Sequence, residues 1–536
     1  MTIPPRDRTN AVPEPSGDAL MVHTRVSGRV LGTNMVSAAF SRLWRTGLQI
    51  VFTPLFIHLL GPEAYGLVAF NATLLMLVLF LDHAVSPVVI REFGRLGGRT
   101  GNSAMMRDLL RSLEVVSFVT AMVLGVAIFA AAPWIATNWL NARGLDPATL
   151  VLALRLMGLN LALQWPSFLY SSSLIALHRQ DVLAKLNILT ATFQAGGAAM
   201  VLWLAGPNVL HFLCWQALGG LIATVAGGYA TWHCMPVWAA RPRVAPAQLR
   251  KVARFAFGTM AIGITTSVLV QADKLVVSKL VPLDRFSAYA VAFALAGQVS
   301  GLVVSPISSV VQPLLAGLVA QGDQAVLVRE YHKWTQMIWG ACLVVPGMLA
   351  AFPAPILAAW LGRHSPMLPL LTPILPFVVA GSMLNGVMSM PFMLQMAAGW
   401  VRLSLVQNLV ALAVVLPALV LLVPRYGVIV GAFLWLGLNL GYLLLAVPIM
   451  HRRLLRTELW RWWLRDTLGP AMVAAALFLG SAWLLPAPAS VWIGLVQAAV
   501  TGGVVGAAML VVMPLARQDV VRALGVLSSL RARWLG

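Results

Sequence analysis

Apolar runs long enough to cross a lipid bilayer recur along almost the whole of this 536-residue chain. A helix needs about 20 mostly apolar residues to span the hydrocarbon layer. A membrane β-barrel would alternate polar and apolar residues in segments of about ten, and runs such as Leu74 to Leu81 and Leu409 to Val423 do not alternate. The pattern therefore predicts an all-α, polytopic membrane protein with about fourteen transmembrane helices.

Composition supports this prediction, because only 10% of the residues are charged against roughly 25% in soluble domains. The formal net charge of +20 would suggest a nucleic-acid partner in a soluble protein, but cytoplasmic loops of membrane proteins collect Lys and Arg. We therefore expect no nucleic-acid partner. The expected spans are 33–60, 65–90, 112–133, 150–176, 183–205, 209–232, 255–280, 286–316, 335–359, 367–394, 402–423, 426–450, 468–486 and 490–514.

The basic residues predict the orientation of these spans. If the N-terminus is cytoplasmic, the loops on that side carry most of the 37 Lys and Arg residues. The opposite loops then hold only Arg143, Arg285, Arg363 and Arg425. Because one missed helix would scramble the alternation, the positive-inside rule supports the span count and places both termini in the cytoplasm.

A short internal repeat predicts two lobes. The first-to-second junction, Leu60 to Phe70, and the seventh-to-eighth junction, Leu280 to Phe293, both read Leu-x-Pro followed by a helix start led by Tyr65 or Tyr289. Six spans separate the two junctions, so the halves insert in the same orientation, as parallel repeats do. Such halves commonly enclose a central cavity, and the last two helices fall outside the repeat.

These observations divide the chain into lobes and basic connections. The expected segments are a disordered cytoplasmic tail (1–29), an N-lobe with spans one to six (30–232), a basic cytoplasmic linker (233–254), a C-lobe with spans seven to twelve (255–450), a basic cytoplasmic loop (451–467), the last two spans (468–514) and a cytoplasmic tail (515–536).

Two arginines in the first span are candidates for an anion site. Ionisable groups inside a span cost about 2.5–3.5 kcal/mol each on insertion scales, so they favour a bundle interior or a wet cavity. Arg42 and Arg45 are three residues apart and share one face of a helix, and Arg binds phosphate with a bidentate fork. The alternatives are snorkelling to the inner interface or pairing with Asp82, which is itself a candidate as a partner or in a proton path.

Polar residues in later spans are candidates for coupling to an ion. Asp273 is the best candidate for a cation or proton site, and the adjacent Lys274 points about 100° away, so the two side chains are not expected to share one face. Asn408 and Asn439 could supply oxygen ligands, although such residues more often hydrogen-bond between helices. Lys274 and Arg91 join the candidates for the substrate site. No metal-ligand spacing and no cofactor motif are present in the sequence.

The stretch from Asn34 to Arg91 resembles a known family. It combines Arg42 and Arg45 with Leu59-Leu-Gly-Pro-Glu-Ala-Tyr-Gly66 at the outer turn and with Leu81-Asp-His-Ala-Val85 and Val89-Ile-Arg-Glu92 at the inner end. This pattern is similar to the polysaccharide transporters of the multidrug/oligosaccharidyl-lipid/polysaccharide (MOP) flippase superfamily. The segment from Asp273 to Tyr289 resembles the start of the second lobe in the same family.

The resemblance implies a flippase that passes an undecaprenyl-pyrophosphate-linked oligosaccharide across the bacterial inner membrane by alternating access between two lobes. Its product would serve surface polysaccharide biosynthesis, such as the O-antigen of lipopolysaccharide. The implied partners are the lipid-linked oligosaccharide, the lipid bilayer and polysaccharide polymerase or chain-length proteins. A Na⁺ or H⁺ gradient is the implied source of any coupling.

Three other functions compete with this interpretation. A cation-coupled multidrug antiporter of the same superfamily would share the architecture but usually has an acidic cavity, and a lipid II flippase would differ in its cargo. A membrane glycosyltransferase or polymerase would be an enzyme, with catalytic residues on a sizeable outer loop. The expected outer loops are short and carry only Glu63, Asp146 and Asp284 as acids, so we predict no enzyme.

Overall fold

The computed structural model describes residues 28–78, 82–97, 102–236, 241–250, 253, 271–520 and 522, with only the backbone described for 28–35, 82–84, 97 and 401. Most of the expected tails 1–29 and 515–536, and most of the span 255–280, therefore lie outside the described residues. Within the described part the elements are helices, and the β-type pairing is one isolated bridge between Asn141 and Pro282. The all-α prediction is confirmed.

Twelve helices in the described part of the chain are long and apolar enough to cross a membrane. The expected number was about fourteen. Two facts account for the difference: one of the twelve, Val36–Val78, contains two of the expected spans, and the expected span 255–280 is described only from residue 271. The multi-pass fold is confirmed.

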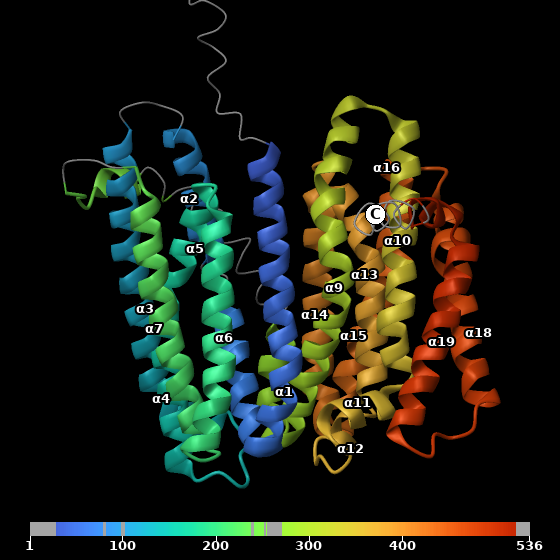
Figure 1. Ribbon diagram of the computed structural model, residues 1–536, viewed down its shortest axis with the longest axis horizontal. Helices are drawn as coiled ribbons and strands as arrows, with labels where there is room; N and C mark the ends of the chain where they lie inside the picture. The colour runs from blue at the N-terminus through green and yellow to red at the C-terminus, as the bar shows by residue number, and fades with distance from the viewer. Residues whose placement is uncertain are drawn as a thin grey trace, which may run out of the picture.

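The first half of the chain forms one bundle, at the left of Figure 1. Its longest element, α1, would measure roughly 77 Å if straight, far more than a bilayer requires. Gly61 interrupts it with non-helical angles, φ 78° and ψ 165°, which suit a residue without Cβ. The helices are α1 (Gly28–Val78), α2 (Asp82–Gly97), α3 (Ser103–Asn138), α4 (Pro147–Gln164), α5 (Pro166–Ala176), α6 (Gln180–Leu204) and α7 (Val209–Cys234).

The second half forms a similar bundle beside the first (Figure 1). It begins with the helical residues 271–280 and ends with a helix that contains the π-helical segment η2. The other elements are α9 (Leu283–Gln321), α10 (Gln324–Ala351), α11 (Pro353–Leu361), α12 (Leu368–Leu371), α13 (Leu375–Ala397), α14 (Val401–Tyr426), α15 (Ile429–Gly441), η2 (Tyr442–Ala446) and α16 (Val447–Leu454).

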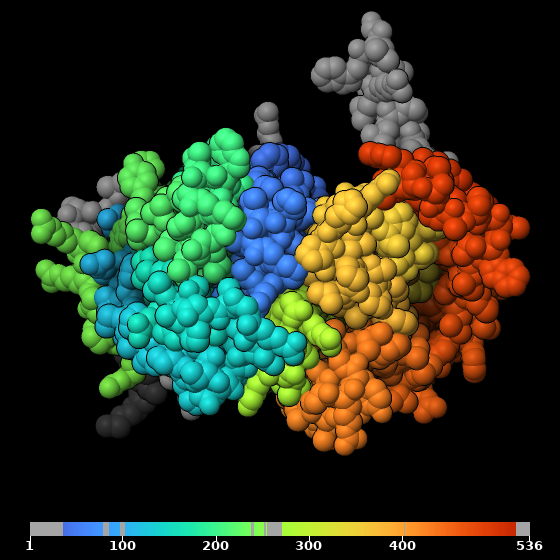
Figure 2. All heavy atoms as spheres, turned by 90° about the horizontal axis from the view of Figure 1, so that it is seen from below, coloured from blue at the N-terminus to red at the C-terminus, as the bar shows by residue number. Residues whose placement is uncertain are grey.

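The last helices pack on the far edge of the second bundle, away from the first (Figures 1 and 2). They are α17 (Leu459–Arg461), the π-helical η3 (Trp462–Leu468), α18 (Gly469–Leu484) and α19 (Val491–Val512). Both α19 and η3 pack against α10. We refer to the first bundle as the N-lobe and to the second, without this last group, as the C-lobe.

Local capping explains where several helices begin. A side-chain oxygen just before a helix can accept backbone N–H groups that have no partner in the first turn. Asp146 accepts from Ala148 at 3.1 Å, and Asn208 accepts from Leu210 at 2.8 Å. Asp323 and Ser490 act in the same way before α10 and α19.

The segment 451–467, expected to be a loop, is largely helical and partly buried. Its charge suggested a solvated connection, but His451, Trp462 and Asp466 are each at most 1% exposed. The segment turns back onto α10, where its polar groups find partners. Burial there required contacts between residues more than a hundred positions apart, which a charge count does not reveal.

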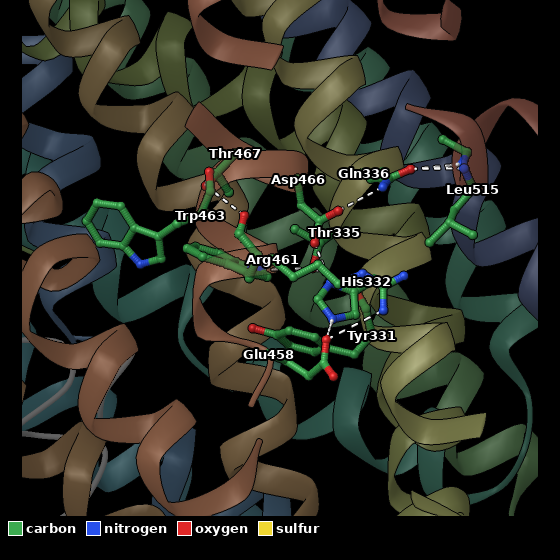
Figure 3. Close-up of polar contacts among 12 residues, drawn as sticks. Tyr331, His332, Thr335, Gln336, Glu458, Arg461, Trp463, Asp466, Thr467 and Leu515 are labelled. Atoms are coloured by element: carbon green, nitrogen blue, oxygen red, sulfur yellow. Dashed lines mark hydrogen bonds and ion pairs between the residues drawn. The ribbon is translucent and has the colours of Figure 1, made fainter. Parts of the chain in front are cut away.

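His332 on α10 joins this segment to the C-lobe (Figure 3). Its Nε2 lies 3.0 Å from Glu458 Oε2, and its Nδ1 contacts Asp466 Oδ2. Gln336 donates to the other Asp466 oxygen at 2.7 Å and accepts the N–H of Leu515 at 3.1 Å. The cluster ties α10, η3 and the segment after α19 together.

We predict that Asp466→Ala lowers the stability of the protein by about 1–3 kcal/mol, because the buried Gln336 amide and the buried His332 ring both lose their carboxylate partner. Thermal unfolding of the detergent-purified protein measures the effect as a lower midpoint. The control is Arg329→Ala, since the Arg329 side chain is 72% exposed and exposed ion pairs contribute little. Equal unfolding midpoints for the two variants would contradict this role of the His332 cluster.

A basic cavity between the lobes

A cavity of about 980 Å³ lies between the N-lobe and the C-lobe. Its walls are α1, residues 271–274, and α9, with Gln180 at the start of α6. The lining extends to Val36 and Ser309, toward the end of the bundle where α2 and α16 lie (top of Figure 1). We call it the central cavity.

The central cavity contains cationic and neutral polar groups. Arg42 and Lys274 are the charged residues among its described lining residues, which include no carboxylate. The neutral polar residues on its wall are Thr46, Gln49, Tyr65, Thr73, Gln180, Gln271, Gln298, Ser305 and Ser309. The cavity therefore attracts anions, and its amides and hydroxyls can hydrogen-bond a hydroxylated ligand.

Arg42 bridges the two lobes. Its guanidinium donates to the hydroxyl of Ser305 on α9. Two turns away, Gln298 Nε2 donates to Gln49 Oε1 at 3.2 Å. Residues seven apart lie on nearly the same face of a helix, so Arg42 with Gln49, and Ser305 with Gln298, form two successive polar contacts between antiparallel helices. An anion in the cavity would meet Arg42 beside these two contacts between α1 and α9.

Arg45 lines an adjoining cavity of about 460 Å³ between α1 and α6. This second cavity shares Arg42, Gln49 and Gln180 with the central cavity. Both arginines of the first span thus face connected polar space between helices. The structure places them together, as the anion-site hypothesis requires.

Asp273 and Lys274 meet in a third cavity of about 300 Å³ inside the C-lobe, which we call the C-lobe pocket. Lys274 Nζ lies 3.2 Å and 3.3 Å from the two Asp273 carboxylate oxygens. The Tyr289 hydroxyl donates to Asp273 at 2.9 Å. The expectation that the two side chains point apart is wrong at the level of their charged groups, because the four-carbon stem of Lys bends the ammonium back.

The two asparagines have different surroundings. Asn408 lines the C-lobe pocket. Asn439 is fully buried, accepts from Asn385 at 3.0 Å and donates to the carbonyl of Trp435 at 2.8 Å, and it is not among the residues that line the pocket. Asn439 therefore supports Asn385, which does line the pocket.

The remaining candidates lie elsewhere. The side chain of Asp82 is outside the described residues. Arg91 is exposed on α2 and lines none of the three cavities. Sequence reasoning missed Gln298, Ser305 and Asn385. Each is an uncharged polar residue in a largely apolar span, so only its position in the folded bundle distinguishes it.

At the opposite end of the bundle the lobes are in close contact, and we call this the closed end (Figure 2). The N–H of Leu283 donates to the carbonyl of Asn141 at 3.1 Å. The indole of Trp139 donates to Ser278 at 3.2 Å, and Lys279 lies 5.0 Å from the centre of the same ring. An apolar cluster also continues from Leu67 and Leu154 into Val281 and Phe286. The central cavity is therefore sealed on this side.

Solved structures share this fold. The lipid II flippase MurJ in an inward closed conformation aligns with a TM-score of 0.70 at 12% identity, over 91% of this chain and 99% of MurJ. An inward-facing multidrug resistance MATE transporter of the MOP superfamily aligns with a TM-score of 0.60 at 12% identity, over 77% and 99%. The chain therefore has the multi-pass fold of these MOP-superfamily transporters.

The sequence identifies the family within this fold. A profile of the family described as "Polysaccharide biosynthesis protein" matches residues 56–363, more than half of the chain. The succinoglycan biosynthesis transport protein ExoT of Rhizobium meliloti is 23% identical over 362 residues, which cover 66% of this chain and 69% of ExoT. The chain belongs to the polysaccharide biosynthesis protein family. The resemblance noted between Asn34 and Arg91 is confirmed at family level.

The closed end leads to a prediction about Gly66, which approaches the other lobe closely. A Cβ at this position would lie 2.5 Å from the carbonyl oxygen of Leu283. Gly66→Ala should therefore weaken closure by about 1–3 kcal/mol, the usual cost of overpacking. The measurement is maleimide labelling of Ser278→Cys in a chain with Cys214, Cys234 and Cys342 replaced by Ser, and Gly66→Ala should speed it.

Gly47→Ala supplies the matched control. It adds the same methyl group to the same helix, but nothing lies within 4 Å of its Cβ. Labelling should keep its original rate in this variant. If Gly66→Ala left the rate unchanged as well, the contact with Leu283 would not hold the closed end together.

Proposed function

We propose that this protein is a flippase for an undecaprenyl-pyrophosphate-linked oligosaccharide of surface polysaccharide biosynthesis, such as the O-antigen of lipopolysaccharide. One observation carries the proposal: among its described lining residues, the cavity between the lobes has cations and neutral polar groups but no carboxylate. A pyrophosphate head with attached sugars matches this lining in charge and in hydrogen-bonding capacity. The bilayer takes the lipid tail.

Arg42 and Arg45 are the proposed pyrophosphate ligands. A guanidinium offers a planar fork that binds two phosphate oxygens at once. Arg42 already makes a side-chain hydrogen bond to Ser305, which a phosphate oxygen could replace. The amides of Gln49, Gln271 and Gln298 are then available for sugar hydroxyls.

The orientation of the chain supports outward transport of the substrate, from the cytoplasmic to the periplasmic side. The positive-inside rule places the basic loops and both termini in the cytoplasm. The central cavity reaches toward that end, and the closed end would face the periplasm of a bacterial inner membrane. This arrangement supports alternating access, with the headgroup entering from the side where it is synthesised and leaving toward the polymerase and chain-length proteins.

The alternatives fit the cavity less well. A multidrug antiporter takes cationic or neutral compounds, and a cationic compound would be repelled by Arg42, Arg45 and Lys274. Relatives of this chain are transporters, and we infer no enzymatic step. The C-lobe pocket, with Asp273 and Asn408, is the proposed site for a coupling Na⁺ or H⁺.

The proposal predicts that Arg42→Gln and Arg45→Gln insert normally but transport poorly. Each variant loses charged hydrogen bonds worth about 1.5–3 kcal/mol, which corresponds to roughly 10- to 150-fold weaker headgroup binding. Complementation of flippase-null bacteria that lack a surface polysaccharide measures transport, and immunoblotting measures insertion. Arg425→Gln, an exposed arginine at the end of α14, is the matched control and should complement fully.

A fully active Arg42→Gln/Arg45→Gln double variant would remove the arginines from the substrate site. A different outcome would favour the antiporter. If the wild-type chain complemented none of several flippase-null strains with different glycans, yet raised drug resistance, the cargo would be a small molecule.

A further inference from the structure

Lys274 stands at the boundary between the central cavity and the C-lobe pocket. It lines both of them, as does Phe293, whereas Asp273 lines only the C-lobe pocket. The Lys274 ammonium lies 5.0 Å from the centre of the Phe293 ring. A single flexible cation therefore forms part of the wall between a space suited to anions and a space that contains a carboxylate.

In the structure the Lys274 ammonium pairs with the Asp273 carboxylate. It contacts both Asp273 oxygens, and both side chains are less than one-fifth exposed. Tyr289 donates to the same carboxylate, and its ring packs where a Cβ on Gly431 would lie, 2.5 Å away. Asp273 is thus held in place and neutralised by an internal cation.

Without that ammonium, the pocket has the composition of a cation site. Asp273, Tyr289, Asn385 and Asn408 place carboxylate, hydroxyl and amide oxygens around it, and oxygen ligands suit hard cations. Among its described lining residues the charged or titratable groups are Asp273, Lys274, Tyr289 and Tyr442, while the other side chains from α13, α14 and α15 are uncharged. Lys274 therefore occupies the position of the ion that the pocket could otherwise bind.

Lys274 also lines the central cavity, where the proposed headgroup would bind. Arg42 lines the same central cavity without a carboxylate among the described lining residues, so an entering pyrophosphate would be the strongest anion there. A Lys side chain turns its charge through several ångströms by rotation about its four-carbon stem. An anion in the central cavity would compete with Asp273 for the ammonium.

We propose that Lys274 exchanges between Asp273 and the pyrophosphate headgroup, so that headgroup binding frees Asp273 to take a monovalent cation, Na⁺ or H⁺. This inference rests on the proposed function. One side chain then links the cargo to the ion, because the pocket accepts its cation only when the cargo holds Lys274. Linkage is reciprocal: the cation raises headgroup affinity by the same factor by which the headgroup raises cation affinity.

The test measures the affinity of the purified full-length protein for undecaprenyl pyrophosphate by titration calorimetry in detergent. One arm replaces choline chloride with sodium chloride at constant ionic strength, and the other lowers the pH without sodium. In the wild type, one of the two cations should strengthen binding roughly 5- to 150-fold, the usual range of coupling between sites. The arm that responds identifies the ion.

Three variants separate the exchange from a general charge effect. Lys274→Met should abolish the cation dependence of lipid binding. In thermal unfolding without lipid, the cation should raise the midpoint of this variant but not that of the wild type, because the wild type binds the cation only together with the lipid. Asp273→Asn should bind the lipid with no cation dependence. Arg425→Gln removes one positive charge at an exposed position outside both cavities, and it should keep the wild-type dependence.

The inference is overturned if Lys274→Met retains the cation dependence, or if wild-type binding of undecaprenyl pyrophosphate responds to neither cation. Failure of the proposed function is distinguishable from both results. In that case the wild type would not bind undecaprenyl pyrophosphate at all, and Arg42→Gln would change nothing, so the exchange would fall together with the function.

Discussion

A charged side chain inside a membrane span is costly in lipid, and Arg42 and Arg45 both lie on the walls of cavities between helices. A charged group in a span persists where other protein groups or trapped water surround it. The first span meets this need by lying between the lobes, with Ser305 and Gln298 of α9 on one side and the start of α6 on the other. The two bundles leave this space where they meet along α1 and α9.

The seam between the lobes differs at its two ends, and this difference makes the cavity one-sided. At the closed end the contacts combine an apolar cluster and the backbone approach of Gly66 to Leu283 with the Trp139–Ser278 hydrogen bond. Toward the other end they are the polar pairs Arg42–Ser305 and Gln49–Gln298. Polar pairs can exchange their partners for water or ligand at little net cost, whereas separating an apolar contact exposes its surface. The contact between the lobes is therefore easier to separate at the end with the polar pairs than at the closed end.

Sequence reasoning succeeded where a strong physical rule acts on consecutive residues. Bilayer thickness sets the apolar runs, so the all-α, multi-pass fold was predictable, and Arg42 and Arg45 stood out because charge is rare in a span. It failed where distant segments meet. The residues 451–467 were expected to be a loop because their charges suggest solvent, yet His332 draws Glu458 and Asp466 into a buried cluster. Asp273 and Lys274 were expected to diverge, since a helical wheel describes where Cβ points and not where an ammonium four carbons away can reach.

Helices gain little hydrophobic attraction for one another inside a membrane, so specific polar contacts decide which of them associate. The His332 cluster joins α10, η3 and the segment after α19 with such contacts, and it lies outside the three cavities. The Asp273 contacts stay within one lobe, and the Arg42–Ser305 contact crosses between lobes. The His332 cluster and the Asp273 contacts join helices on the same side of the central cavity, whereas the Arg42–Ser305 contact would break if the lobes moved apart. Polar groups in the described part of this protein therefore divide by location. Those within one lobe have partners in the same lobe, and those between the lobes have partners in the other lobe.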